Sequence, residues 1–190
     1  MASQPKSYLT PEEYLAMERK AEYKSEYFAG EVFAMVGASR KHNLITANII
    51  AALIQQLKRR PCELYPSDMR VRVPATGSYT YPDVVVACGE PEFEDDYLDT
   101  LLNPVVIIEV LSASTASYDR IKKFGYYRTI DSLNEYLLVA QDEYKIEQYI
   151  KQPDGRWLLA DIKSLEATVE MPSIQCKLPL ADVYDKVSLP

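Results

Sequence analysis

The sequence predicts a mixed α/β protein in which helices flank a central mixed β-sheet. Two helical patterns, near residues 10–20 and 40–58, alternate with short apolar strands. Two of the strands, at 84–88 and 104–111, are rich enough in Val and Ile that we expect them to be buried. No repeat and no linker divides the chain, so we expect one domain over residues 1–190.

The first elements are a helix and a hairpin. Thr10 can cap a helix, Pro11 suits the first helical position and Glu13 completes a capping box, so a helix is expected to run to about Lys20. The segment YFAGEVFAM then has the pattern of a strand that Gly30 interrupts with a turn. We therefore expect a hairpin directly after the first helix.

A long helix follows Ser39 in the run HNLITANIIAALIQQLKRR and ends before Pro61. Its apolar residues recur at the spacing of one helical face, at positions 45, 49, 50, 53, 54 and 57. That face is expected to pack on the sheet.

The remainder of the chain has mostly the pattern of strands. We expect a helix from about Tyr118 to Thr129, an acidic loop at 90–103 and a mostly extended tail after Glu166. The expected strands are CELYP, MRVRVP, VVVA after Asp83, Pro104–Leu111, EYLLVA, and the pair YKIEQYIK and RWLLADI around a turn at Pro153-Asp154-Gly155.

Composition narrows the classes of function. A net charge of −7 argues against a large, non-specific phosphate-binding surface, although a local basic groove remains compatible with it. The basic run Lys58-Arg59-Arg60 is typical of a solvated helix face. No apolar run is long enough to span a membrane, and no secretory signal is present, so we expect a cytoplasmic protein. The three cysteines, Cys62, Cys88 and Cys176, are expected to be reduced or buried thiols.

Two acidic residues sit in unusually apolar strands. Strand alternation sets Glu109 on the same face as Val105, Ile107 and Leu111, while Asp83 opens the strand VVVA. Each acid alone is typical of a turn or a strand end. If the two strands are neighbours, however, the two carboxylates converge, and a cation or a proton must then offset their repulsion. Oxygen-only ligands suit Mg²⁺ or Mn²⁺, so we expect Asp83 and Glu109 to bind one of these metals.

A lysine on the following helix is the third candidate. Asp119 and Lys123 are spaced as a stabilising helix pair, which is one interpretation of Lys123. The functional interpretation brings its ammonium near Glu109, where it would stabilise charge that develops on a phosphate. Lys122 competes for this role, and the spacing alone does not decide between the two lysines.

His42 and Glu26 are weaker candidates. His42 is the only histidine, and at the start of the long helix it is either an ordinary polar residue or a phosphate contact. Glu26 follows the first helix and is a possible further acid. The chain has no nucleotide-binding glycine motif and no G-x-S-x-G motif, so neither a nucleotide cofactor nor a hydrolase triad is expected.

These residues and their order resemble the PD-(D/E)XK restriction-endonuclease-like superfamily. More narrowly, they are similar to a large bacterial family of restriction-endonuclease-like proteins that was long classed as a domain of unknown function. The matching segments cover nearly the whole chain, and the run EVLS-x-ST-x-x-x-D-R-x-x-K-x-x-x-Y is the most specific. They are SEYFAGEVFAMVGAS, KHNLITANI, SDMRVRV, YPDVVVA, VVIIEVLSASTASYDRIKKFGYY, EYLLV and PSIQCKLPLADVY.

The resemblance implies a central mixed sheet flanked by helices, Asp83 and Glu109 as metal-binding acids, and Glu26 as a further acid near the site. It also places His42 at the edge of the site. In the superfamily the lysine usually lies two residues after the glutamate, a position that Leu111 occupies here. In this family the lysine is expected on the following helix, where Lys123 is in register.

The leading hypothesis is therefore a Mg²⁺- or Mn²⁺-dependent DNA endonuclease in which Asp83 and Glu109 hold the metal and Lys123 and Glu26 assist. The alternative is a catalytically weak or inactive protein on the same fold that acts as a nucleic-acid-binding or interaction module. The acidic net charge and the displaced lysine favour that alternative. A homodimer is also expected, because many nucleases of this fold pair to cut both strands.

Overall fold

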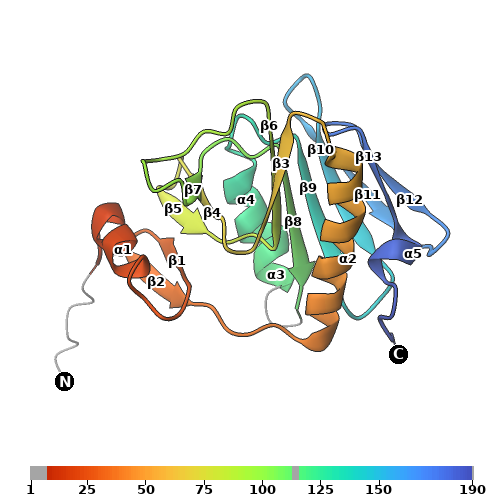
Figure 1. Ribbon diagram of the computed structural model, residues 1–190, viewed down its shortest axis with the longest axis horizontal. Coiled ribbons are helices and arrows are strands. Elements are labelled where there is room, and N and C mark those ends of the chain that lie inside the picture. The colour runs from red at the N-terminus through yellow and green to blue at the C-terminus, as the bar shows by residue number, and fades with distance from the viewer. Residues whose placement is uncertain (1–7, 113–115, 190) are drawn as a thin grey trace.

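A six-stranded mixed sheet lies at the centre of the protein (Figure 1). The computed structural model describes residues 8–112 and 116–189. The sheet has the order β11–β10–β9–β8–β6–β3; β8 and β9 are parallel and the other neighbours antiparallel. This confirms the predicted central mixed sheet. Its strands are β3 (Cys62–Pro66), β6 (Val84–Cys88), β8 (Val106–Leu111), β9 (Glu135–Ala140), β10 (Ile146–Lys151) and β11 (Trp157–Ile162).

The long helix α2 (Arg40–Leu57) covers one face of this sheet (Figure 1). Ile45, Ile49 and Leu53 are fully buried in one cluster with the Val and Ile side chains of β6 and β8. Ile54, which the periodicity assigned to the buried face, is 50% exposed, so the apolar stripe is narrower than predicted. The same layer is completed by β12 (Thr168–Met171), β13 (Cys176–Pro179) and α5 (Leu180–Val183).

The helical segment after β8 packs on the opposite face of the sheet. It consists of α3 (Ala116–Tyr118), the π-helix η1 (Asp119–Lys123) and α4 (Phe124–Tyr127), where a single helix was predicted. Tyr127 is fully buried in a cluster with Ile107, Leu111 and Tyr136 from the sheet. Wider π turns occur mostly inside α-helices and often at functional sites.

A second sheet of five strands, ordered β2–β1–β5–β4–β7, lies beside the helical segment (Figure 1). The hairpin turns at Gly30, whose φ of 88° glycine adopts without steric cost. Part of the predicted acidic loop forms β7 instead, parallel to β4. The elements are α1 (Pro11–Glu18), which begins at the predicted capping box, β1 (Ser25–Phe28), β2 (Glu31–Ala34), β4 (Arg70–Val73), β5 (Ser78–Thr80) and β7 (Thr100–Leu101).

One prediction about the cysteines is wrong. Cys62 and Cys88 are joined by a disulfide, because they lie directly opposite each other on β3 and β6. The two cysteines are 26 residues apart in sequence, so no local pattern predicts their pairing. The register of the two strands brings them together. Cys176 is free and buried, as expected. Within residues 8–112 and 116–189 no helix combines the length and the apolar character that crossing a bilayer requires.

Candidate active site

Glu109 lies inside the protein on the face of β8 that meets the helical segment. Ile107 and Leu111 share that face, while Val106, Ile108 and Val110 point to α2, as strand alternation predicts. Only 5% of Glu109 is exposed. A buried carboxylate requires compensation, and groups of this protein supply it.

Lys123 is the main compensating group for Glu109. Its Nζ lies 3.1 Å from Oε1 of Glu109, 3.0 Å from Oε1 of Glu26 and 3.7 Å from Oδ1 of Asp119. Lys123 is 8% exposed and lies in the π-helical segment, directly over β8. The structure thus brings together Glu109, Lys123 and Glu26 from three separate elements.

The two candidate lysines lie in different surroundings. Lys122 is exposed, whereas Lys123 is buried against the carboxylates. Asp119 and Lys123 do form the helix pair that the sequence suggested. This pair is part of the buried cluster and does not replace the contact with Glu109.

Asp83 lies beside Glu109 because β6 and β8 are neighbours. Val84 pairs with Ile108, so the register continued by one residue sets Asp83 opposite Glu109. Oδ2 of Asp83 accepts a hydrogen bond of 2.7 Å from the backbone N–H of Val110 and lies 3.1 Å from Nε2 of His42. His42, on the first turn of α2, is therefore at the edge of the site, where it was expected.

The site carries more acids than cations. Burial is the main cause that raises the pKa of Glu109 to about 8; Lys123 opposes this shift, and the negative charges of Asp83, Asp119 and Glu26 add to it. Burial alone would lower the pKa of Lys123, but the charges of Glu109, Glu26 and Asp119 raise it well above its usual value. Lys123 therefore stays charged, and the surplus of negative charge favours an additional cation.

Sequence reasoning missed Tyr127, which contacts Glu109, and Thr80, which contacts Tyr127. The hydroxyl of Tyr127 lies 3.0 Å from Oε1 of Glu109 and 2.9 Å from Oγ1 of Thr80, in a fully buried position. Tyr127 is four residues after Lys123, and that spacing on one helical face is the signal that could have identified it. For Thr80 we found no comparable signal in the sequence.

Two carboxylate oxygens remain for a metal. Oδ1 of Asp83 and Oε2 of Glu109 have no hydrogen-bond partner within residues 8–112 and 116–189, because the hydrogen bonds of both carboxylates use the other oxygen. No group of three or more His, Cys, Asp or Glu within the described ranges is arranged to hold a metal ion. Mg²⁺ commonly binds to one or two carboxylates and keeps several waters, so the donor set fits this ion.

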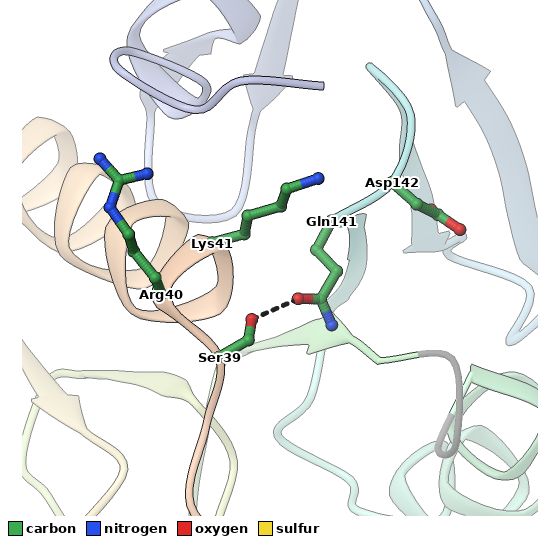
Figure 2. Close-up of a pocket in the computed structure, with 5 residues that line it drawn as sticks. All are labelled: Ser39, Arg40, Lys41, Gln141 and Asp142. Atoms are coloured by element: carbon green, nitrogen blue, oxygen red, sulfur yellow. Dashed lines mark hydrogen bonds between the residues drawn. The ribbon is translucent and has the colours of Figure 1, made fainter. Parts of the chain in front are cut away.

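A shallow pocket with two basic residues lies at the start of α2, next to His42 in sequence (Figure 2). Ser39, Arg40 and Lys41 line one side, and Gln141 and Asp142 line the other. Oγ of Ser39 and Oε1 of Gln141 are 2.6 Å apart and connect the two sides. Within the described ranges Arg40 and Lys41 form no ion pair, so both charges are available to a ligand.

Comparisons with known proteins found relatives in sequence and a solved structure of the same fold. An uncharacterized protein of Synechocystis sp. is 43% identical over 162 residues, which cover 85% of this chain and 92% of that protein. A second one from the same organism is 35% identical over 182 residues, 96% and 94% of the two chains. A crystal structure of a "putative nuclease belonging to DUF820" from Anabaena variabilis has the same fold, with a TM-score of 0.78, 19% identity and coverage of 95% and 99%.

A family model describes the same span of the chain. The model is named Uma2, has the description "Putative restriction endonuclease" and matches residues 11–181. This range contains all five of the candidate site residues, which are Glu26, His42, Asp83, Glu109 and Lys123. The chain belongs to the Uma2 family of restriction-endonuclease-like proteins.

Proposed function

We propose that this protein is a Mg²⁺- or Mn²⁺-dependent endonuclease that hydrolyses phosphodiester bonds in DNA. The observation that carries the proposal is the pair of unpartnered oxygens on Asp83 and Glu109, next to the ammonium of Lys123. These two acids would hold the metal. Membership of the Uma2 family supports a nuclease-like role.

A bound Mg²⁺ supplies Lewis-acid polarisation of a phosphoryl oxygen and lowers the pKa of a bound water. The chain's own residues supply the remaining functions. Lys123 presents a positive charge in a nearly water-free position, where it stabilises negative charge that develops on the phosphate. Glu26 and Tyr127 fix the positions of Lys123 and Glu109 through their contacts.

His42, Arg40 and Lys41 would bind the DNA backbone beside the reacting phosphate. The three residues are consecutive in the first turn of α2. His42 already contacts Asp83. Charged side chains that contact phosphates position a nucleic acid without reading its sequence. The pocket of Figure 2 would then receive a phosphate adjacent to the one that is cleaved.

The test is a cleavage assay with purified protein, supercoiled plasmid and Mg²⁺ or Mn²⁺. Wild-type protein should nick or cut the DNA, and Asp83→Ala should abolish cleavage. Asp154→Ala is the matched control, because Asp154 pairs with Arg156 in the turn between β10 and β11, away from the acids. Wild-type protein that cleaves no form of DNA with either metal would overturn the proposal.

A second candidate function is a nucleic-acid-binding module without catalysis. The observation that favours it is that Lys123 already contacts three carboxylates, which reduces the charge available to a substrate. Calorimetric titration with Mn²⁺ separates the two functions. A nuclease should bind Mn²⁺ through Asp83 and Glu109 and lose this binding in Asp83→Ala, whereas the module should show no binding above background.

The homodimer also stays a prediction. Leu158 and Leu159 lie on the edge strand β11 and are 58% and 50% exposed, so this edge presents an apolar side chain on each face that a second copy could cover. Light scattering of the purified protein measures the mass in solution. A mass of one chain at all protein concentrations would contradict the dimer.

A further inference from the structure

Four aromatic rings form a cluster between the β1–β2 hairpin and the helical segment. Phe28 is at its centre: its ring centroid lies 6.2 Å from that of Phe33, 6.1 Å from Tyr118 and 5.4 Å from Tyr126. Phe33 is 49% exposed, and the other three are half-buried. The cluster therefore presents aromatic surface to solvent and is not part of the closed core.

The cluster is directly adjacent to the acids and the lysine of the candidate site. Glu26, which contacts Lys123, is the register partner of Phe33, so the two side chains project from the same face of the hairpin. Phe28 is two residues after Glu26 and shares that face. Tyr118 immediately precedes Asp119, the third carboxylate around Lys123. A ligand held at Lys123 would thus have the rings at its side.

Charge indicates what kind of nucleic-acid contact this surface can make. The net charge is −7, and several arginines are already in ion pairs with carboxylates, so a broad phosphate-binding surface for a duplex is disfavoured. Stacking of bases on aromatic side chains supplies affinity without such a surface, and it tolerates any base sequence. It requires, however, that the base is not already paired and stacked in a helix.

We propose that the ring cluster binds an unpaired nucleobase next to the phosphodiester that is cleaved, so that the preferred substrate is DNA with unpaired nucleotides. This inference rests on the proposed nuclease function and names its substrate class. Phe33 offers an exposed ring, and Phe28 contacts this ring edge-on, with the two ring planes 68° apart. Glu26 keeps Lys123 beside the same rings, which fixes the position of the phosphate relative to the base.

The test uses a short single-stranded DNA that carries 2-aminopurine, whose fluorescence is quenched by stacking, together with the same strand in a duplex. Binding is measured in EDTA, so that no cleavage occurs. Wild-type protein should quench the single strand and bind it more tightly than the duplex. Phe33→Ala should lose the quenching and weaken single-strand binding about tenfold, while duplex binding stays unchanged. Phe33→Trp, which keeps a ring, should restore both.

The matched control is Val36→Ala. Val36 is 91% exposed, lies shortly after β2 and belongs to no ring contact, so quenching and affinity should stay at wild-type levels. Circular dichroism checks that each variant is folded. Single-strand affinity and quenching that are equal in wild type and Phe33→Ala would overturn the inference. A change from dimer to monomer in Phe33→Ala would also overturn it, because Phe33 would then belong to an interface between copies.

The outcomes separate this inference from the proposed function. Cleavage by wild-type protein with quenching that does not depend on Phe33 overturns the stacking site alone. Quenching that depends on Phe33 without cleavage under any metal overturns the nuclease and leaves the stacking site in place. If wild-type protein neither cleaves DNA nor shows quenching that depends on Phe33, both proposals are overturned.

Discussion

The ammonium of Lys123 lies 3.1 Å from Oε1 of Glu109, although the two residues come from a helix and a strand. In the restriction-endonuclease-like superfamily the lysine is usually on the same strand as the glutamate, two residues later. Leu111 occupies that place here and packs in the core. The contact with Lys123 shows that a residue on the next element reaches the same carboxylate.

Replacement of Lys123 by Met should destabilise the protein and remove its activity. The change leaves Glu109 and Glu26 buried without their cation, which costs about 3 kcal/mol of unfolding free energy. Cleavage should fall at least about a hundredfold, because the phosphate loses its charge partner. Urea denaturation and the plasmid assay measure the two effects. Lys122→Met is the control, and equal losses in both variants would contradict the assignment of Lys123.

Tyr127→Phe should reduce cleavage while the protein stays folded. The variant keeps the buried ring but leaves Glu109 and Thr80 without their shared hydroxyl, at a cost of about 1.5 kcal/mol. Tyr127 acts through Glu109, so the metal concentration needed for half-maximal cleavage should rise. Tyr126→Phe, one residue earlier and half-buried, should behave as wild type in both measurements. Unchanged metal dependence in Tyr127→Phe would argue against a positioning role.

Reduction of the Cys62–Cys88 disulfide should lower the free energy of unfolding. The bond closes a loop between positions 26 residues apart, for which the chain-entropy model gives about 3.5 kcal/mol. Urea midpoints with and without dithiothreitol measure this effect. The double variant Cys62→Ser, Cys88→Ser should be insensitive to the reductant, since Cys176 has no partner in the described structure. A wild-type midpoint that ignores the reductant would contradict the disulfide.

Asp99→Asn should make the protein less sensitive to acid. Hydrogen bonds from Arg19 are the largest cause that lowers the pKa of Asp99; burial opposes them, and Arg70 lowers it further. The pKa of Asp99 is lower in the folded protein than in the unfolded chain, so the ionised carboxylate stabilises the folded state. This stabilisation is fully present above the unfolded pKa of about 3.9 and is lost as the pH falls from there toward the folded pKa.

The measurement compares urea midpoints at pH 7 and pH 3. Wild type should lose more stability between these pH values than Asp99→Asn, whose stability at pH 7 should be lower by about 2 kcal/mol. Asp154→Asn removes an exposed ion pair and should follow the wild-type curve closely. Parallel pH profiles for Asp99→Asn and wild type would show that Asp99 is not the group that titrates.

Much of the fold follows from local patterns in the sequence. Three features depend only on neighbouring residues and could be predicted from the sequence. They are the capping box at Thr10, the turn at Gly30 and the alternation around Glu109. The disulfide and the position of β7 depend on which strands become neighbours, and no local pattern contains that information. The π turn was likewise not predicted, because the run from Tyr118 to Thr129 was interpreted as one ordinary α-helix.

The site was predictable only in part for the same reason. Asp83 and Glu109 could be predicted as site residues, because burial of an ionised carboxylate in an apolar strand costs free energy. The register of β6 and β8 places the two residues side by side. The choice of Lys123 over Lys122 required the direction of each side chain. The roles of Glu26 and Phe33 depend on a hairpin that belongs to the other sheet. Whether the assembled residues cleave DNA stays a prediction.

The hairpin that carries Glu26 is tied to its sheet at a single register pair, Tyr27 with Tyr79. Its partner Lys123 belongs to a segment far along the chain, so this contact forms at high loop-closure cost. We therefore expect β8, β9 and the helical segment between them to assemble early, and the hairpin to dock after the transition state. Glu26→Gln should therefore accelerate unfolding and leave the folding rate unchanged, so that the chain gains its last acid only when folding is nearly complete.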